Sequence, residues 1–127
     1  PDTNGTETAT GEVEVPLVKL AWARSGDKGD HANIGVIARH ARYLPYLRAA
    51  LTEQAVADYM KHVLNHPASA VQRWEMPGFN AFNFLLKNAL GGGGIASLRI
   101  DPQGKGFAQQ LLDFPVPVSA EIAESVR

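Results

Sequence analysis

Hydrophobic and polar positions follow two different periods along the chain, and each change of period marks an expected element. Short apolar runs predict strands over residues 17–23, 34–38, 71–76 and 95–100. Apolar positions that recur every three to four residues predict helices over residues 43–65, 79–90 and 106–113. The first helix is expected to break near Pro45 and to reopen at Thr52, a good N-cap residue. The expected order is therefore β-β-α-β-α-β-α.

This order predicts an α+β fold, a two-layer sandwich with a mixed sheet of about four strands and helices on one face. A helix between successive strands favours parallel pairing for the last three strands. The first two strands are expected to pair antiparallel across a loop, Ser25–Asn33. Residues 1–14 are rich in Thr, Gly and Glu, which predicts a flexible tail, and residues 15–127 form one domain.

One face of such a sheet has no helix over it. The first two expected strands show little polar alternation, and strands of this kind are normally buried on both faces. Trp22 and Trp74 are expected to be core or interface aromatics. We therefore predict self-association or docking to a partner through the open sheet face or an edge strand.

Composition narrows the function classes. The chain has 127 residues and no Cys, so disulfides, thiolate catalysis and cysteine metal sites are excluded. With 12 basic and 13 acidic residues the net charge is −1, which gives no electrostatic case for binding nucleic acid. No apolar run approaches the ~18 residues of a transmembrane helix. We expect a cytoplasmic domain that binds no membrane and no cofactor.

The densest group of polar side chains lies in the loop Ser25–Asn33. His31 can act as a general base oriented by Asp27 or Asp30, with Lys28 holding an anion. The same two carboxylates and the imidazole can instead ligate a divalent metal. An ordinary solvated turn also has this composition. The loop supplies the candidate catalytic residues Asp27, Lys28, Asp30 and His31 and the candidate binding residues Ser25 and Asn33.

Three further candidate binding residues lie outside this loop. Asn83 and Lys87 fall one turn apart on the helix expected over residues 79–90, so they can approach the loop together. Asn83 is then expected to bond a loop carbonyl, and Lys87 to pair with Asp27 or Asp30. Lys105 precedes an expected helix and can hold a carboxylate or phosphate at its start, although a plain turn also fits.

Several motifs together carry a resemblance to a known family. They are Ala23–Asp30, Ala32–Val36, Phe82–Gly94, Ser97–Arg99 and Gln103–Lys105. In these motifs the chain resembles the small ferredoxin-fold domain of the AtuA-like, acyclic terpene utilisation family, from about Leu17 to Val118. A ferredoxin-like sandwich runs β-α-β-β-α-β, so the expected order implies a rearranged or extended version.

The resemblance implies a role in the breakdown of terpenoid or other branched acyl compounds. In that family the domain commonly follows a larger domain in one chain and also occurs as a separate small protein. The first hypothesis is therefore an accessory domain that completes or covers the acyl-substrate site of a larger AtuA-like protein. A second copy of this chain is the other expected partner. The alternatives are a small acid–base enzyme for an acyl thioester or acid, and a metal-binding domain. The resemblance carries no catalytic role over to these positions.

Overall fold

The computed structural model describes residues 8–28, 31–61, 70–76, 78–87 and 107–127, with only the backbone of residues 27, 28 and 70. Its main sheet has four strands in the order β2-β3-β5-β4, and every neighbouring pair is antiparallel. These strands are β2 (Ala21–Lys28), β3 (His31–Ala38), β5 (Ala81–Lys87) and β4 (Ala70–Met76). A second sheet pairs β1 (Val13–Pro16) with β6 (Pro115–Val118), also antiparallel.

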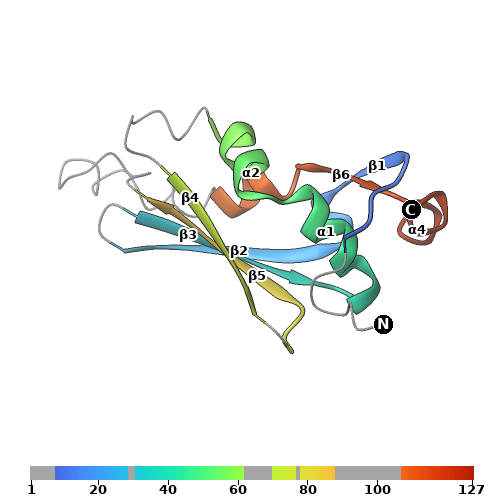
Figure 1. The fold of residues 1–127 in the computed structure, drawn as a ribbon, viewed down its shortest axis with the longest axis horizontal. Helices are drawn as coiled ribbons and strands as arrows, with labels where there is room; N and C mark the ends of the chain where they lie inside the picture. The colour runs from blue at the N-terminus through green and yellow to red at the C-terminus, as the bar shows by residue number, and fades with distance from the viewer. Residues whose placement is uncertain (1–7, 29–30, 62–69, 77, 88–106) are drawn as a thin grey trace.

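The helices are short. They are the 3₁₀ turns η1 (Leu17–Lys19) and η2 (Ala41–Tyr43) and the α-helices α1 (Leu44–Ala50), α2 (Glu53–Tyr59) and α4 (Ala120–Ser125). Residues 107–111 are also helical. Figure 1 shows α1 and α2 along one side of the four-stranded sheet, with the β1–β6 pair beside α1.

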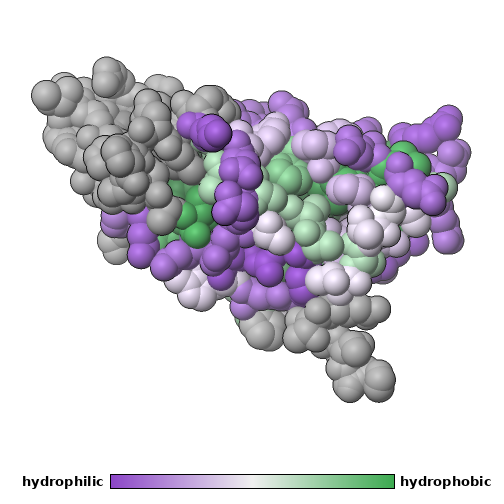
Figure 2. All heavy atoms as spheres, turned by 45° about the horizontal axis from the view of Figure 1, so that its top comes forward, coloured by the Kyte–Doolittle hydropathy of each residue, from purple (hydrophilic) through white to green (hydrophobic). Residues whose placement is uncertain are grey.

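The core lies between the helices and one face of the main sheet. Alternate residues of β3 and β5, among them Ile34, Val36, Phe82 and Phe84, are fully buried there. From the helical side they meet apolar residues that include Leu47, Leu51, Val56, Phe107 and Leu111. Seen from above the helices, hydrophobic residues gather at the centre of the surface, with hydrophilic residues around them (Figure 2). The predicted α+β sandwich with helices on one face of a four-stranded sheet is confirmed.

The strand directions differ from the expectation. Parallel pairing is wrong for the described strands, because β3 and β4 each pair antiparallel with β5. The two helices between β3 and β4 do make these strands run parallel to each other, but β5 is inserted between them. The result is a split βαβ unit, the ferredoxin-like arrangement. The fourth strand, β2, lies beside β3 and comes before the unit in sequence, which is the rearrangement that the element order implied.

The segment expected to be a helix over residues 79–90 is instead strand β5. The turn before it excludes a helical start, since Gly78 and Asn80 have positive φ of 85° and 53°. From Phe82 onward the side chains alternate between the core and the other face, the period of a strand. The prediction followed a spacing of three to four among the same apolar residues, and a short apolar run fits both periods.

The polar segment Ser25–Asn33 is not a long loop. The first two strands do pair antiparallel, but β2 reaches Lys28 and β3 begins at His31, so only residues 29 and 30 connect them. The expected strand over residues 17–23 is also corrected, because Leu17–Lys19 forms the turn η1 and the strand begins at Ala21.

Other expected elements agree with the structure where they are described. Thr52 is the N-cap of α2, and its hydroxyl accepts a hydrogen bond from the Ala55 backbone N–H at 3.1 Å. The helix expected over residues 106–113 is confirmed for residues 107–111. By contrast, within the tail expected over residues 1–14, Ala9 N–H donates to the carbonyl of Pro45 at 2.9 Å and β1 begins at Val13, so the described part of this segment packs on the domain. The strand expected over residues 95–100 lies outside the described residues.

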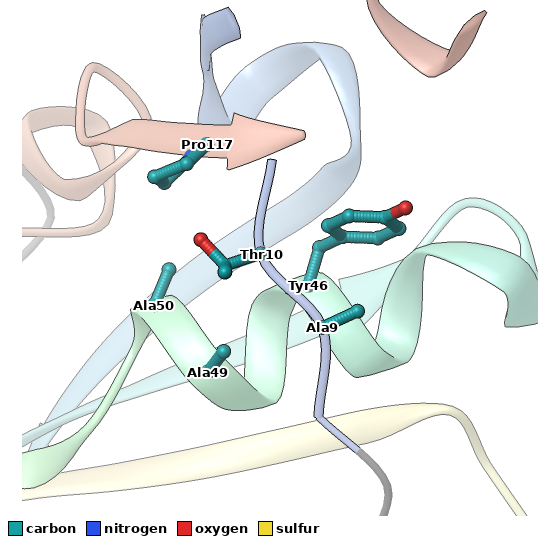
Figure 3. A pocket seen from close by; sticks show the side chains of 6 residues that line it. All are labelled: Ala9, Thr10, Tyr46, Ala49, Ala50 and Pro117. Carbon is teal, nitrogen blue, oxygen red and sulfur yellow. The ribbon is translucent and has the colours of Figure 1, made fainter. Parts of the chain in front are cut away.

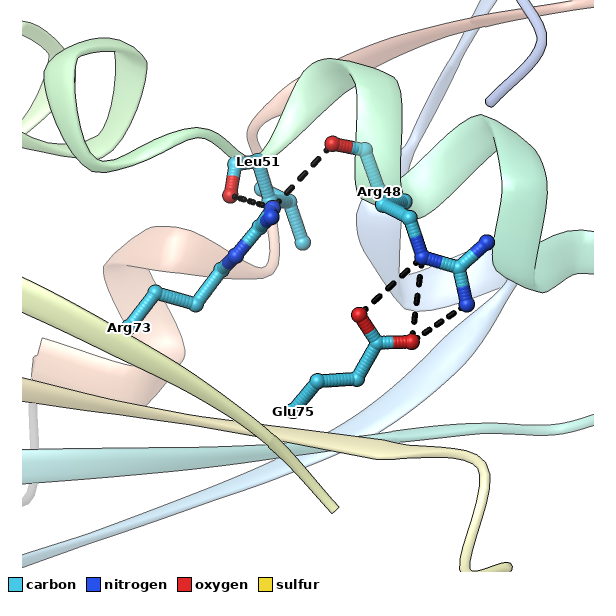
Figure 4. Close-up of polar contacts among 4 residues, drawn as sticks. All are labelled: Arg48, Leu51, Arg73 and Glu75. Atoms are coloured by element: carbon cyan, nitrogen blue, oxygen red, sulfur yellow. Dashed lines mark hydrogen bonds and ion pairs between the residues drawn. The ribbon is translucent and has the colours of Figure 1, made fainter. Parts of the chain in front are cut away.

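An arginine–glutamate network joins the helices to strand β4 (Figure 4). Arg48 of α1 is only 7% exposed, and its Nε lies 3.0 Å from each carboxylate oxygen of Glu75. Arg73 donates to the carbonyls of Arg48 and Leu51, at 3.1 and 2.8 Å. A cation at the C-terminal end of a helix is favourable because it meets free carbonyls and the negative end of the helix dipole. These contacts hold the helical layer against the sheet.

Candidate functional site

The second face of the four-stranded sheet, opposite α1 and α2, is the main candidate surface. We call it the open face. The strand register places its positions in rows that cross the sheet, because directly paired residues share a face. The first row is Trp22, Ile37, Ala81 and Met76, the second is Arg24, Gly35, Asn83 and Trp74, and the third is Gly26, Asn33, Leu85 and Gln72.

Large apolar side chains are exposed on the open face. Trp22 and Trp74, on the two edge strands, are 51% and 48% exposed, and Ile37 and Met76 are 41% and 45% exposed. The guanidinium of Arg39 stacks on Trp22, 4.6 Å from the ring centroid. Exposed apolar residues that share one face are more informative than scattered ones, because such groups mark interaction sites.

Two asparagines face glycines across the centre of the open face. Gly26 pairs with Asn33, and Gly35 pairs with Asn83. A Cβ atom added at Gly35 would come no closer to another group than 4.0 Å, the distance to the side-chain oxygen of Asn83. A glycine in a central strand often marks a place where another group approaches the backbone closely. The sheet therefore offers space beside a carboxamide at its centre.

The structure places four of the predicted site residues on the open face. Asn33 is opposite Leu85, and Asn83 and Lys87 flank Leu85 on the same strand, so both are diagonal neighbours of Asn33. His31, two residues before Asn33, shares this face. Ser25 does not, because it pairs with the buried Ile34 on the side of the helices. Asn83 and Lys87 thus approach the segment 25–33 through a sheet rather than from a helix.

The remaining predicted residues are described incompletely. The backbone of Asp27 pairs with Ala32 and that of Lys28 with His31, while Asp30 and Lys105 lie outside the described residues. Within the described part of the chain, no three His, Asp or Glu side chains are grouped closely enough to hold a metal ion. The metal-binding and acid–base hypotheses, which need Asp27 or Asp30, stay predictions.

The sequence interpretation missed the contribution of Arg24 and Gly35 to this surface. Arg24 is exposed in the second row, directly opposite Gly35. The signal was present in the alternation of small and large residues from Ala21 to Arg24, which is typical of a strand with one face exposed. The composition of the segment after Arg24 hides this signal, because its glycine and polar residues predict a loop.

Two further features lie on the helical side. A pocket of about 160 Å³ lies between the N-terminal segment and α1, lined by Ala9, Thr10, Tyr46, Ala49, Ala50 and Pro117 (Figure 3). It has no charged lining residue. On α2, burial raises the pKa of Tyr59 above its ordinary value of 10.0, and the nearby Asp113 carboxylate raises this pKa further.

Fold and surface together define a small α+β sandwich domain with one sheet face that none of the described helices covers. Comparison with protein families matches residues 15–117 to the AtuA ferredoxin-like domain. The chain belongs to this family, and the resemblance seen in its motifs is confirmed. Comparisons with curated proteins and with solved structures found no match. None of the described helices is long and apolar enough to cross a membrane.

Proposed function

We propose that this chain is an accessory domain that binds a larger AtuA-like protein through its open face. The proposal places the pair in the cytoplasm, in the breakdown of terpenoid or branched acyl compounds. The observation that carries it is the exposure of Trp22, Trp74, Ile37 and Met76 on one sheet face. Family membership supports the choice of partner, because this domain type is commonly joined to a larger one.

The free energy available on this face is large enough to matter. Burying a Trp removes up to about 250 Å² from water, and about half of that remains exposed at each of the two indoles. At about 25 cal/mol per Å², burying the exposed half contributes about 3 kcal/mol per indole before the costs of association. Trp is also among the residues that most often dominate binding energies.

Co-expression with the larger AtuA-like protein of the same organism tests the proposal. We expect the two chains to purify together, and the double variant Trp22→Ala/Trp74→Ala to bind at least tenfold more weakly. Val13→Ser is a matched control, because Val13 is exposed on the β1–β6 sheet rather than on the open face. Circular dichroism and thermal unfolding of each variant separate loss of binding from loss of fold.

Two results would overturn the accessory role. One is the absence of binding between the two purified chains. The other is turnover of acyl thioesters by the isolated chain at rates typical of an enzyme, about 1 s⁻¹ or more. Such turnover, if lost with His31→Ala, would favour the acid–base alternative instead.

A further inference from the structure

We propose that the open face recognises a carboxylate-bearing protein surface, and that Arg24, Gly35, Asn83 and Trp74 form the row that receives a carboxylate. The inference deepens the proposed function and rests on it for the identity of the larger partner. The partner must present carboxylates beside apolar groups.

The charge of the open face carries the inference. Arg24 and Lys87 lie on this face, and Arg39 extends along its edge over Trp22. None of the described acidic side chains occupies an open-face position of the four strands. They are Glu12, Glu14, Glu53, Asp58, Glu75, Asp113, Glu121 and Glu124. The net charge of the chain is −1, yet all the charged side chains described on the open face are cationic.

The two polar side chains of the second row, those of Arg24 and Asn83, have no hydrogen-bond or ion-pair partner within the described structure. No hydrogen bond or ion pair there involves the side chain of Arg24 or of Asn83, although Asn83 is half-buried. Gly35 lies between them, with space above it. A carboxylate above Gly35 would lie between the Arg24 guanidinium and the Asn83 carboxamide. The Asn83 oxygen is the carboxamide atom nearest Gly35, so the amide turns over to donate its N–H to the carboxylate. An arginine–carboxylate contact of this kind is among the stronger hydrogen bonds in proteins.

The same charge argues against a second copy as the occupant. A symmetric dimer packs one patch against the identical patch, so it would place the cationic patch that holds Arg24, Lys87 and Arg39 against a second cationic patch. Like charges facing each other across an interface oppose association. An acidic surface that also carries apolar groups would satisfy both the cations and the exposed indoles.

A single-stranded nucleic acid is the other anionic occupant to consider. Sheet-based RNA binders stack bases on aromatic side chains of the sheet face. Here the two indoles lie on opposite edge strands and in neighbouring rows, separated across the sheet by three strand spacings or about 14 Å. In the second row, Gly35 and Asn83 lie at the two central positions. The centre of the face therefore offers hydrogen bonding rather than a stacking platform, which favours the acidic protein surface.

Nuclear magnetic resonance of the isotope-labelled chain tests the chemistry without the partner. The probes are a peptide of alternating Glu and Leu, a matched peptide of Lys and Leu, and a twelve-residue oligothymidylate. We expect the acidic peptide alone to shift the Gly35 backbone amide and the Asn83 side-chain amide. Equal or stronger binding of the basic peptide or of the oligonucleotide would overturn the inference, as would the absence of any shift.

Two variants and a control locate the row. Arg24→Glu reverses the charge, and Gly35→Val fills the space without changing charge, while the contact to Asn83 at 4.0 Å leaves room for a Cβ. Both are expected to weaken acidic-peptide binding at least tenfold. Lys61→Glu makes the same charge change at an exposed position after α2 and should leave binding unchanged. Retained binding in both row variants, with native folds, would overturn the inference.

The same variants separate this inference from the proposed function. If the larger AtuA-like protein binds, but neither Arg24→Glu nor 0.3 M salt weakens the complex, the accessory role stands and the carboxylate row is wrong. If the acidic peptide binds as expected and the larger protein does not, the row stands and the accessory role fails.

Discussion

Replacing Glu75 with Gln tests whether the arginine–glutamate network holds the helical layer to the sheet. The side chains of Arg48 and Glu75 are 7% and 27% exposed, so the pair is largely out of water. Removing one partner of a buried pair costs about 3–5 kcal/mol, because the other charge loses its compensation. Since Glu75 keeps some contact with solvent, we expect a cost below that range, about 2–3 kcal/mol. For a domain of 127 residues this corresponds to a fall in Tm of about 10 °C.

The substitution keeps the shape of the side chain, removes its charge and replaces one of the two oxygens that accept from Arg48 with an NH₂ group. Urea unfolding followed by tryptophan fluorescence measures the effect. Glu124→Gln is the matched control, because Glu124 pairs with Arg127 at 3.2 Å with both side chains more than 70% exposed. That change is expected to stay within about 0.5 kcal/mol. A Glu75→Gln protein as stable as the control would refute the reasoning.

Three further predictions follow from the described structure. Burial raises the pKa of Tyr59 in the folded state, so the stabilising contribution of this side chain is full below pH 10.0 and is lost as the pH rises through the raised pKa. Urea midpoints measured between pH 8 and 11 should therefore fall less steeply in Tyr59→Phe than in the unmodified protein, and identical curves would contradict this. Gly11→Ala places a Cβ 2.0 Å from the Val118 carbonyl carbon, so the β1–β6 pairing must shift and faster hydrogen exchange in β1 is expected. Unchanged exchange would contradict this and show that the backbone adapts freely. Thr52→Ala removes the N-cap of α2 and should cost about 1 kcal/mol in urea unfolding, a loss that Thr52→Ser should largely avoid.

The sequence alone determined the family, the α+β class and several local features. The strand end expected at Met76 and the helix start at Thr52 both agree with the structure, because such signals depend on a few neighbouring residues. The motifs that carried the family resemblance span most of the chain, and the family match over residues 15–117 confirms them. The expectation of a sheet face bare of helices also came from element order alone.

The tertiary structure decided what fills the centre of the sheet. The segment from Phe82 to Lys87 fits the helical and the extended period equally well, and only hydrogen bonding to β3 and β4 on both sides selects the strand. That choice moves Asn83 from a helix surface to the middle of the sheet, opposite Gly35. The pairing of β2 with β3 separates Ser25 from His31, because Ser25 shares a face with Ile34, and Ile34 and His31 are three residues apart in one strand. The distribution of charge also depends on the tertiary structure. Composition gives only a net charge of −1, whereas long-range strand pairing brings Arg24 and Lys87 onto one face, on which none of the described acidic side chains lies.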